Sequence, residues 1–402
     1  MTNTHQTPFE ATAGHAGPDA RSDCQVRVWR PEPGVAPEVI LRSKVASMYG
    51  PAIRALLLET RATLDADDLA IEIDDLGALP WTLMARLEAA VQRLRPEMRA
   101  TAPSPPAFAG AGLTRSADRG HGLRRSRLYL PGDAPKLFIN AGLHRPDAVI
   151  LDLEDAVAPA EKDAARILVR NALRSVDFHG AERMVRVNAL PAGLADIAGL
   201  APHGVDVFVL PKVESAEAVA AAHACIQQAG ATSGLLATIE TAKGVLRAAE
   251  IAAAPGVVAM TLGLEDYAAD IGAIRTRDGR ESAWARGQIL NAARAAGVQP
   301  LGSVYADIDD ADGFLAWARA EQQMGFEGVA CLHPRQIALA HNAFAPTPDE
   351  VAKARRIVAA YEEALVSGLG AIAVDGRMVD ASVAARARKV LARQAAAGGN
   401  AS

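Results

Sequence analysis

The chain has 402 residues, of which 50% are apolar, and a formal net charge of −5, so it can bury a large core or form more than one domain. The negative charge argues against a nucleic-acid-binding protein, which normally carries an excess of basic residues. Its three cysteines, Cys24, Cys225 and Cys331, lack the paired spacing of a disulfide framework and fit a reducing cytoplasm.

No targeting or membrane segment is expected. The N-terminal sequence lacks a basic start followed by an apolar block, which argues against a secretory signal. The apolar stretch AAEIAAAPGVVAMTLGL is interrupted by Glu250 and Pro255 and does not fit a membrane span. The sequence therefore predicts a cytoplasmic protein with no membrane or nucleic-acid partner.

The first third of the chain predicts a tail, a small domain and a linker. Residues 1–21 show no sustained pattern, and we expect a disordered tail. Residues 22–94 contain strand-like CQVRVW and LAIEID and two helical patterns, SKVASMYGPAIRALLLETRATL and PWTLMARLEAAVQRL, which together indicate a small α+β domain. Residues 95–124 are rich in Pro, Ala, Gly and Ser and predict a linker.

Residues 125–345 alternate short apolar runs with longer helical patterns. The eight runs are RLYLP, AVILDLE, MVRVNAL, VDVFVLPK, GLLATIE, VVAMTLG, PLGSVYADI and GVACLHP. Eight strands separated by helices favour an α/β fold, a parallel (β/α)8 TIM barrel. Residues 346–402 predict a C-terminal helical extension, which is more than a barrel needs.

Most of these runs become polar at their C-terminal ends. Polar residues at or beside these ends are Asp152, Glu154, Arg186, Asn188, Lys212, Glu240 and Asp266. Because the C-terminal ends of barrel strands converge on one mouth, where such enzymes place their sites, we expect these side chains to lie together. This explains why carboxylates interrupt an otherwise apolar strand.

Glu240 and Asp266 follow neighbouring runs, and two carboxylates without clustered His or Cys suit a hard cation such as Mg²⁺. The structural alternative is that Glu240 caps a helix beginning at Thr241 and Asp266 is solvated in a loop. Arg186 lies in an apolar strand and needs a carboxylate partner. That partner is either Glu154 or Asp152, in a salt bridge, or a bound ligand.

A basic cluster surrounds the first barrel run. RRSRLYLPGDAPK contains Arg124, Arg125, Arg127 and Lys136. Such a cluster can receive phosphates, but charge beside a linker is more often plain solvation.

The segments RSRLYLPG, ILDLEDAV, VRVN, LPKVES, IETAKG, LGLEDYAADIG, CLHPRQI and GRMVD lie between residues 124 and 392. In order and spacing they resemble the citrate lyase β-subunit family of thioester lyases, also called the HpcH/HpaI aldolase family. The resemblance implies a barrel that uses Mg²⁺ to cleave or form the bond between a 2-oxo or 3-hydroxy acid unit and an acetyl-type thioester.

The resemblance also implies roles for individual residues. Glu240 and Asp266 match the metal ligands, and Arg186 matches a residue that contacts the substrate. Asp380, in GRMVD, matches an aspartate that handles a proton at the mouth of a neighbouring subunit in trimers of this family. We assign Glu154 to the catalytic group as well. Binding of the coenzyme A thioester is assigned to four residues: Arg125, Tyr129, Pro131 and Lys212.

The first domain resembles the acyl carrier subunit of citrate lyase, related to the carrier of malonate decarboxylase. In that family a serine two residues before an aspartate holds a phosphoribosyl-dephospho-CoA arm. Asp23 matches the aspartate, but Arg21 stands at the arm position and Ser22 follows one residue later. Either Ser22 carries the arm through a local shift, or the domain has no arm, and we favour the second reading.

The leading hypothesis is a Mg²⁺-dependent lyase of citryl, malyl or similar short 3-hydroxyacyl thioesters, on coenzyme A or an acyl carrier. We expect a homo-oligomer, a trimer or a multiple of it, and a citrate-lyase-like transferase subunit is a candidate partner. Two alternatives stay open. One is a malyl-CoA-type thioesterase on the same barrel, and the other is a non-catalytic carrier or scaffold subunit of a lyase complex.

Overall fold

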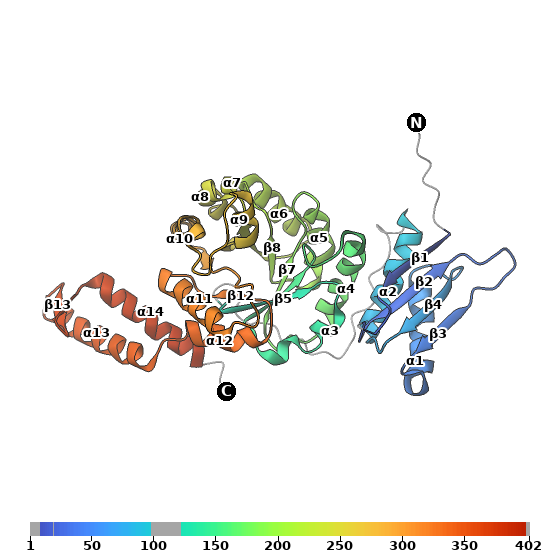
Figure 1. Ribbon diagram of the computed structural model, residues 1–402, viewed down its shortest axis with the longest axis horizontal. Coiled ribbons are helices and arrows are strands. Elements are labelled where there is room, and N and C mark those ends of the chain that lie inside the picture. The colour runs from blue at the N-terminus through green and yellow to red at the C-terminus, as the bar shows by residue number, and fades with distance from the viewer. Residues whose placement is uncertain (1–8, 19, 98–121, 399–402) are drawn as a thin grey trace.

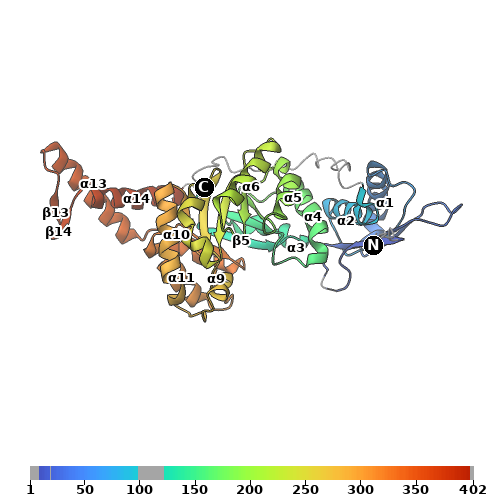
Figure 2. The same cartoon turned by 90° about the horizontal axis from the view of Figure 1, so that it is seen from above.

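The structure is a computed structural model that describes residues 9–18, 20–97 and 122–398. A small α+β domain comes first, a barrel follows, and a helical extension projects from the barrel (Figure 1). Seen from above, the small domain and the extension lie at opposite ends of the molecule (Figure 2). Most of the predicted linker, residues 98–121, lies outside the described residues.

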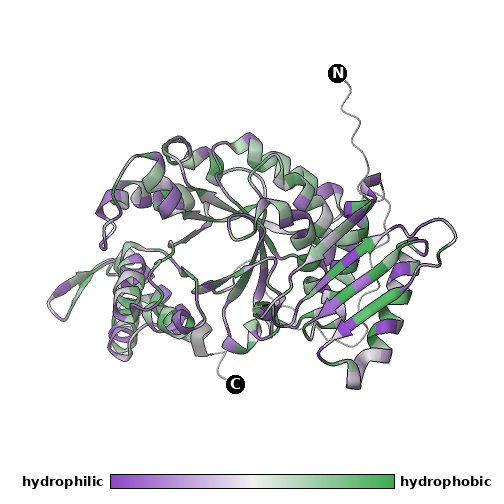
Figure 3. Cartoon of the chain, turned by 45° about the vertical axis from the view of Figure 1, so that its right-hand side comes forward, coloured by the Kyte–Doolittle hydropathy of each residue, from purple (hydrophilic) through white to green (hydrophobic). Residues whose placement is uncertain are grey.

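The small domain is α+β, as the sequence predicts, and consists of a four-stranded sheet with two helices. Its elements are β1 (Glu10–Gly14), β2 (Cys24–Trp29), β3 (Val39–Ser43), α1 (Ala46–Thr63), β4 (Ala70–Asp75) and α2 (Pro80–Leu94), with the strands in the order β1-β2-β4-β3. Cys24, Val26 and Val28 alternate along β2 and are fully buried, as expected for a strand with one face on the core. The alternation of hydrophobic and hydrophilic residues along these strands is visible in Figure 3.

Strands β1 and β3 were not predicted from the sequence, which showed two strand-like segments in this domain. We placed residues 1–21 in a disordered tail, but β1 pairs antiparallel with β2 over its whole length, from Glu10 opposite Trp29 to Gly14 opposite Gln25. The sequence EATAG has few bulky or β-branched residues, so its strand conformation depends on pairing rather than on propensity. Residues 1–8, also placed in that tail, lie outside the described residues.

All eight predicted barrel runs are strands. They are β5 (Ser126–Pro131), β6 (Ala148–Asp152), β7 (Glu182–Arg186), β8 (Val207–Leu210), β9 (Gly234–Ile239), β10 (Val257–Leu262), β11 (Gln299–Leu301) and β12 (Val329–Cys331). Every neighbouring pair in the order β11-β10-β9-β8-β7-β6-β5-β12 is parallel. A parallel bridge between Val304 and Ala330 links β11 to β12 and closes the barrel.

Helices cover the outside of the barrel (Figure 1). They are α3 (Pro135–Phe138), α4 (Lys162–Ser175), α5 (Gly193–Leu200), α6 (Ala216–Gln228), α7 (Ala242–Leu246), α8 (Ala248–Ala252), α9 (Leu264–Asp270), α10 (Ala283–Ala296), α11 (Ala311–Met324) and α12 (Arg335–Phe344). Inside the strands, side chains such as Ile150, Met184, Val209 and Leu236 form a separate buried cluster. The interior is therefore a packed core that leaves only the C-terminal ends of the strands to line a mouth.

The C-terminal extension is a helical hairpin with a small two-stranded sheet at its tip. It consists of α13 (Pro348–Val366), β13 (Ile372–Val374), β14 (Arg377–Val379) and α14 (Ala381–Gly398). Thr347 begins α13 with a capping box, because its hydroxyl accepts from the Glu350 amide and the Glu350 carboxylate accepts from the Thr347 amide. Within the described ranges, no helix has the length and apolar character that a bilayer crossing requires.

The small domain packs on the barrel through α2 and α4, which lie side by side (Figure 1). Between them, Arg170 of α4 donates to both carboxylate oxygens of Glu88 of α2, at 2.8 and 2.5 Å. Glu88 is fully buried, so its charge depends on this one guanidinium for a countercharge.

The Glu88–Arg170 pair gives a stability prediction. Arg170→Met leaves a buried carboxylate without a countercharge, so we expect the free energy of unfolding to fall by about 3–5 kcal/mol. The double variant Glu88→Gln/Arg170→Met removes both charges and should recover most of this loss. Urea unfolding measures both values. As a control, Arg388→Met breaks the exposed pair with Glu362 and should cost less than about 1 kcal/mol. Equal losses in the single and double variants would contradict this account.

Candidate active site

Charged side chains from four strand ends and one helix meet at the mouth of the barrel. Asp152 and Arg186 end β6 and β7 and stand opposite each other in the strand register. Glu154, Lys212 and Glu240 follow β6, β8 and β9 by one or two residues, and Asp266 lies in the first turn of α9. The structure thus gathers six of the seven predicted polar residues, whereas the side-chain amide of the seventh, Asn188, donates to Asp196 of α5 at 2.7 Å.

Arg186 is the centre of this group. Its Nε and Nη2 donate to the two carboxylate oxygens of Asp152 at 2.7 and 2.6 Å, and its Nη1 lies 2.8 Å from Glu154 Oε2. Its guanidinium also lies over the ring of Tyr129, 5.2 Å from the centroid. Burial alone would lower the pKa of Arg186, but its hydrogen bonds to Asp152 raise the pKa above its usual value.

Arg186 therefore forms the salt bridges that we weighed as the structural alternative to ligand binding. A guanidinium has five N–H donors. Only one hydrogen bond from Nη2 is made to the residues that the structure describes, the one to Asp152. A second Nη2 hydrogen remains for a substrate oxygen, so the salt bridges orient the guanidinium without using all its donors.

Lys212 connects Arg186 to the carboxylates on the other side of the mouth. Its Nζ donates to Glu154 Oε1 at 2.8 Å, and its backbone N–H donates to Glu240 Oε2 at 2.9 Å. The second contact needs a left-handed backbone, and Lys212 has φ of +52°. Hydrogen bonding to Glu154 raises the pKa of Lys212, so its ammonium stays charged.

Glu154 is buried between the two cations. Burial raises the pKa of its carboxyl, and Lys212 and Arg186 oppose this shift. With a salt bridge on each oxygen, Glu154 keeps Arg186 and Lys212 in fixed positions.

Glu240 is 3% exposed and lies against the backbone of Gly263, at the end of β10. A Cβ at Gly263 would stand 2.5 Å from Glu240 Oε1, so any other residue there would displace the carboxylate. Burial raises the pKa of Glu240 to about 7, and the nearby Glu154 and Asp266 add to this shift. A carboxylate held in such an environment gains from a bound cation.

Asp266 completes this acidic side of the mouth. It is exposed and lies close enough to Glu240 and Lys212 to influence the pKa of each. No hydrogen bond or ion pair joins Asp266 to another of the described residues. Its carboxylate is therefore available to a ligand.

This pair of carboxylates fits Mg²⁺. In the described part of the chain no three or more His, Cys, Asp and Glu side chains gather as a metal site. Mg²⁺ needs only one or two protein carboxylates, because water and substrate oxygens complete its octahedron. Glu240 and Asp266 could supply those two ligands. The alternative reading of Glu240 as a helix cap does not hold, because Thr241 caps α7 with its own hydroxyl.

Three of the four residues assigned to thioester binding lie at the mouth. They are Lys212, described above, Tyr129 and Pro131. Tyr129 points into the barrel beneath Arg186, and Pro131 ends β5 opposite Asp152. Burial raises the pKa of the Tyr129 hydroxyl, which therefore stays protonated.

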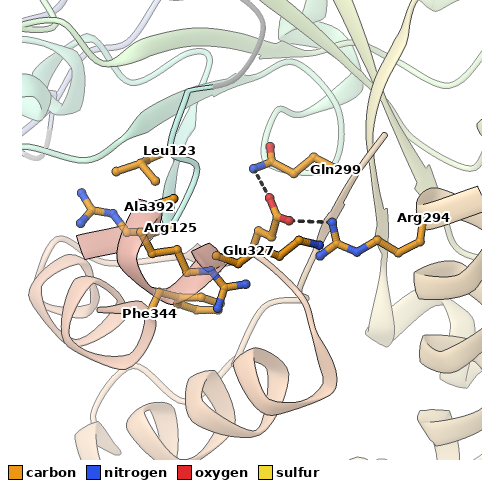
Figure 4. Close-up of a pocket in the computed structure, with 9 residues that line it drawn as sticks. Leu123, Arg125, Arg294, Gln299, Glu327, Phe344 and Ala392 are labelled. Atoms are coloured by element: carbon orange, nitrogen blue, oxygen red, sulfur yellow. Dashed lines mark hydrogen bonds and ion pairs between the residues drawn. The ribbon is translucent and has the colours of Figure 1, made fainter. Parts of the chain in front are cut away.

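Arg125 is the fourth, and the structure does not bring it to the mouth. It precedes the first residue of β5, roughly 20 Å from the C-terminal end of that strand, and its guanidinium binds Asp147 at 2.8 Å. There it lines a cavity of about 300 Å³ with Arg294, Glu327 and α14 (Figure 4). The other two arginines of the basic cluster also have partners within the protein, since Arg124 binds Glu182 and Arg127 is buried with its Nη2 on the Gly302 carbonyl. Lys136 is exposed in α3, beyond the C-terminal end of β5.

Asp380 is not at the mouth of its own chain either. It follows β14 at the tip of the extension, away from the barrel (Figure 2). Its Oδ1 accepts from the Val383 amide at 2.9 Å and from the Ser382 hydroxyl at 2.8 Å. The Val383 hydrogen bond lowers the pKa of Asp380. Within one chain Asp380 thus caps the start of α14.

Sequence reasoning missed Lys162 and Gly263. Lys162 Nζ donates to the carbonyls of Leu153 and Glu154, at 2.9 and 2.8 Å, and so holds the loop that carries Glu154. Nothing in the sequence marks this lysine among the charges of EKDAARILVR. Gly263 had a weak signal, because it is a glycine between a strand and the acidic start of a helix.

A closed parallel barrel with charged side chains at its C-terminal mouth is the architecture of a TIM-barrel enzyme. The chain belongs to the HpcH/HpaI aldolase/citrate lyase family, whose model matches residues 125–334. The first domain matches the model of the malonate decarboxylase delta subunit over residues 11–94, which confirms its acyl-carrier-like character.

Relatives of known name cover about two thirds of the chain. The citrate lyase subunit beta of Haemophilus influenzae is 42% identical over 282 residues, which is 67% of this chain and 97% of that protein. A (3S)-malyl-CoA thioesterase of Cereibacter sphaeroides is 38% identical over 271 residues, 67% of this chain and 94% of that protein. The structure of CitE from Mycobacterium tuberculosis with magnesium, acetoacetate and coenzyme A is 36% identical, has a TM-score of 0.60 and covers 69% of this chain and 100% of that chain.

The raised pKa of Glu240 predicts how pH affects stability when divalent cations are chelated. The folded carboxyl keeps its proton up to about pH 7, whereas the usual pKa is 4.5. The folded state thus binds more protons between these values, and the contribution of Glu240 to stability falls as pH rises through them. Glu240→Gln cannot ionise, so at pH 8 it should be more stable than the wild type by roughly 2–3 kcal/mol.

Urea unfolding in a chelator at pH 4.5 and pH 8 measures this difference, which should nearly vanish at the lower pH. Glu265→Gln, at the exposed neighbour of Asp266, is the control and should show little change at either pH. A Glu240→Gln variant that is no more stable than the wild type at pH 8 would refute the buried carboxyl as described.

Proposed function

We propose that the protein is a Mg²⁺-dependent oxo-acid lyase. It cleaves a short 3-hydroxyacyl thioester, such as citryl-CoA or malyl-CoA, into an oxo acid and an acetyl-type thioester, or it forms the thioester from these two compounds. The observation that carries this proposal is the position of Glu240 and Asp266 beside Arg186 at one mouth. The named relatives support it, since they include a citrate lyase subunit and a structure with magnesium and coenzyme A.

Glu240 and Asp266 would hold the Mg²⁺ ion. When bound, the ion supplies a Lewis acid that polarises substrate oxygens and lowers the pKa of the substrate hydroxyl. Deprotonated Glu240 is favoured once a cation offsets the repulsion from Glu154 and Asp266, so metal binding and loss of the Glu240 proton are coupled.

Arg186 stabilises the charge that develops on the thioester. During cleavage the hydroxyl group loses its proton to water and becomes the carbonyl of the oxo acid, and the C–C bonding electrons move to the acetyl unit as an enolate. The free Nη2 hydrogen of Arg186 binds the enolate oxygen. Asp152 and Glu154 fix the guanidinium before the reaction, so little reorganisation is needed in the transition state.

The enolate must then take a proton on its terminal CH2 carbon, which becomes a methyl group, and we assign the delivery of this proton from water to Asp380 of a neighbouring subunit. Apolar side chains at the tip of the extension favour such a neighbour, because Val366 and Met378 are 91% and 71% exposed and a second subunit would cover them. We therefore propose a homo-oligomer, a trimer or a multiple of it. In the condensation direction the same carboxylate removes the methyl proton.

Free coenzyme A is the carrier that we favour, with Tyr129, Pro131 and Lys212 lining its path at the mouth. Arg125 is left out of this proposal because it lies at the other end of β5. The three cysteines are free, which fits a reaction in the reducing cytoplasm. Ser22 has a left-handed backbone, with φ of +62°, and stands one residue from the arm position, so we propose that it carries no phosphoribosyl-dephospho-CoA arm.

Loss of either metal ligand gives the direct test. Glu240→Ala and Asp266→Ala should each lower Mg²⁺-dependent release of oxo acid by at least about 10³-fold, because each removes a protein ligand from a cation that has only two. The assay is oxo-acid release from a panel of 3-hydroxyacyl-CoA esters. Glu265→Ala, at the exposed residue beside Asp266, is the matched control and should keep activity near that of the wild type. Full turnover in both ligand variants would rule the mechanism out.

A malyl-CoA-type thioesterase is the second candidate, supported by the 38% identical relative. Its products are an intact hydroxy acid and a free thiol, whereas a lyase releases an oxo acid and keeps the thioester. A carrier or scaffold role is the third. It would show as stable association with a citrate-lyase-like transferase subunit and no turnover of any acyl-CoA.

The position of Asp380 predicts complementation between subunits. Glu240→Ala and Asp380→Asn should each be inactive alone. Mixed in equal amounts and reassembled, they should recover about one quarter of wild-type activity, because random assembly joins an intact mouth to an intact tip at that frequency. The activity of the mixture after reassembly measures this fraction. No recovery in confirmed mixed oligomers would place the proton donor within the same chain.

A further inference from the structure

The acyl-carrier-like domain and the barrel share one hydrophobic core. Residues 81–91 of α2 are all buried, including those on the helix face turned away from the domain's own sheet. A helix that is buried on every side is a core element. The ring of Trp81 in α2 stacks with that of Phe138 in α3, at 6.2 Å between centroids. A carrier that swings between partners would need to expose this surface.

Charged contacts hold the same interface at its edge. Arg93 of α2 donates to Asp163 of α4 at 3.0 and 2.7 Å and to the carbonyl of Ala160 at 2.8 Å. Together with the buried Glu88–Arg170 pair, these contacts tie α2 to α4 along its length. Leaving the barrel would therefore cost the domain both apolar burial and the pairing of buried charges.

A third contact reaches the mouth of the barrel. Arg86 of α2 is fully buried, and its Nε and Nη2 donate to the two oxygens of Asp23 at 2.9 and 2.8 Å. The same Nη2 donates to the backbone carbonyl of Asp133 at 2.9 Å. Asp133 lies in the loop between β5 and α3 (residues 132–134), directly after the C-terminal end of β5.

Further contacts hold the Asp23 carboxylate that binds this guanidinium. Its Oδ1 also accepts from the Cys24 amide at 2.8 Å, and His15 Nδ1 lies 3.1 Å from its Oδ2. Burial opposes ionisation, but hydrogen bonds from His15 and Arg86 lower the pKa of Asp23. The charge on the guanidinium strengthens its hydrogen bond to the Asp133 carbonyl.

The β5–α3 loop leads directly to the Arg186 network. Gly132, the residue before Asp133, donates its N–H to the backbone carbonyl of Asp152 at 2.8 Å. A Cβ at Gly132 would stand 2.6 Å from that carbonyl, so the loop is packed against the end of β6. Asp152 in turn orients Arg186 through its two carboxylate oxygens. Contiguous contacts thus run from the small domain to the side chain proposed to bind substrate.

We propose that the acyl-carrier-like domain is a fixed lobe of this enzyme, in which Arg86 and Asp23 position the β5–α3 loop and, through it, Asp152 and Arg186. Arg86 is a positioning residue that touches no substrate. The inference rests on the proposed lyase function for its kinetic consequence, but the position of the loop can be measured without turnover. The proposal also gives the domain a role that needs no prosthetic arm, because the domain supports a loop at the mouth of the barrel.

The test uses the full-length protein. Asp23→Asn/Arg86→Met removes both buried charges and the hydrogen bond to Asp133, so no unpaired charge remains. Arg93→Met is the matched control, because it weakens the same interface without touching the loop. We expect the double variant to lose roughly tenfold or more in kcat for oxo-acid release, with a smaller change in KM, as a displaced catalytic side chain does. The control should stay within about twofold of the wild type.

Hydrogen–deuterium exchange supplies a readout that does not depend on activity. In the double variant the amides of residues 132–138 should exchange roughly tenfold faster or more, whereas in Arg93→Met faster exchange should be confined to α2 and α4. Arg86→Lys is a second variant in case the double variant does not fold. It keeps the charge beside Asp23 but loses the fork that also reaches Asp133, and it should shift kcat and exchange in the same direction.

Unchanged exchange at residues 132–138 in the folded variants, with kcat within about twofold of the wild type, would overturn the inference. Equal effects of Arg93→Met and the double variant would do the same, because they would reduce Arg86 to a general stabiliser of the interface. If the wild type releases no oxo acid, the proposed function fails, and the exchange experiment still decides whether Arg86 holds the loop.

Discussion

The largely buried guanidinium of Arg186 is the constraint on which the mouth of this barrel depends. A cation at this depth is stable only with carboxylates around it, and Asp152 and Glu154 supply them. Glu154 in turn binds Lys212, whose amide holds Glu240. Charged contacts thereby fix four strand ends relative to one another, and Glu240 and Asp266 lie beyond Lys212 at the same mouth.

Much of this arrangement could be predicted from sequence because strand direction carries the information. The apolar runs marked all eight barrel strands, and their polar ends marked the mouth, since parallel strands end on one side. The same rule would have excluded Arg125, which directly precedes its strand, and its assignment to the site came from the basic cluster and the resemblance. Strand β1 was missed because EATAG owes its conformation to the backbone of β2. Lys162 was missed because only the folded loop brings its ammonium to the Glu154 carbonyl.

The sequence also divided the chain into a carrier-like domain and a barrel at a linker, and the family comparisons support these two kinds of domain. What the sequence did not show is that the domains share a core. The pattern of α2 contained a hint, because Arg86 and Glu88 lie in a helix whose other residues are mostly apolar. Both are fully buried. Arg86 binds Asp23 and the Asp133 carbonyl, and Glu88 binds Arg170. Buried charge in a helix of a small domain is therefore a sign that the domain does not stand alone.

The left-handed backbone of Lys212 carries a cost that stability alone would not select. A residue with a Cβ in this conformation is roughly 1 kcal/mol or more worse off than glycine. Glycine would relieve the backbone and still present the amide to Glu240, but it would leave Glu154 with one cation instead of two. Position 212 thus combines a strained backbone with a side-chain charge that the buried Glu154 requires.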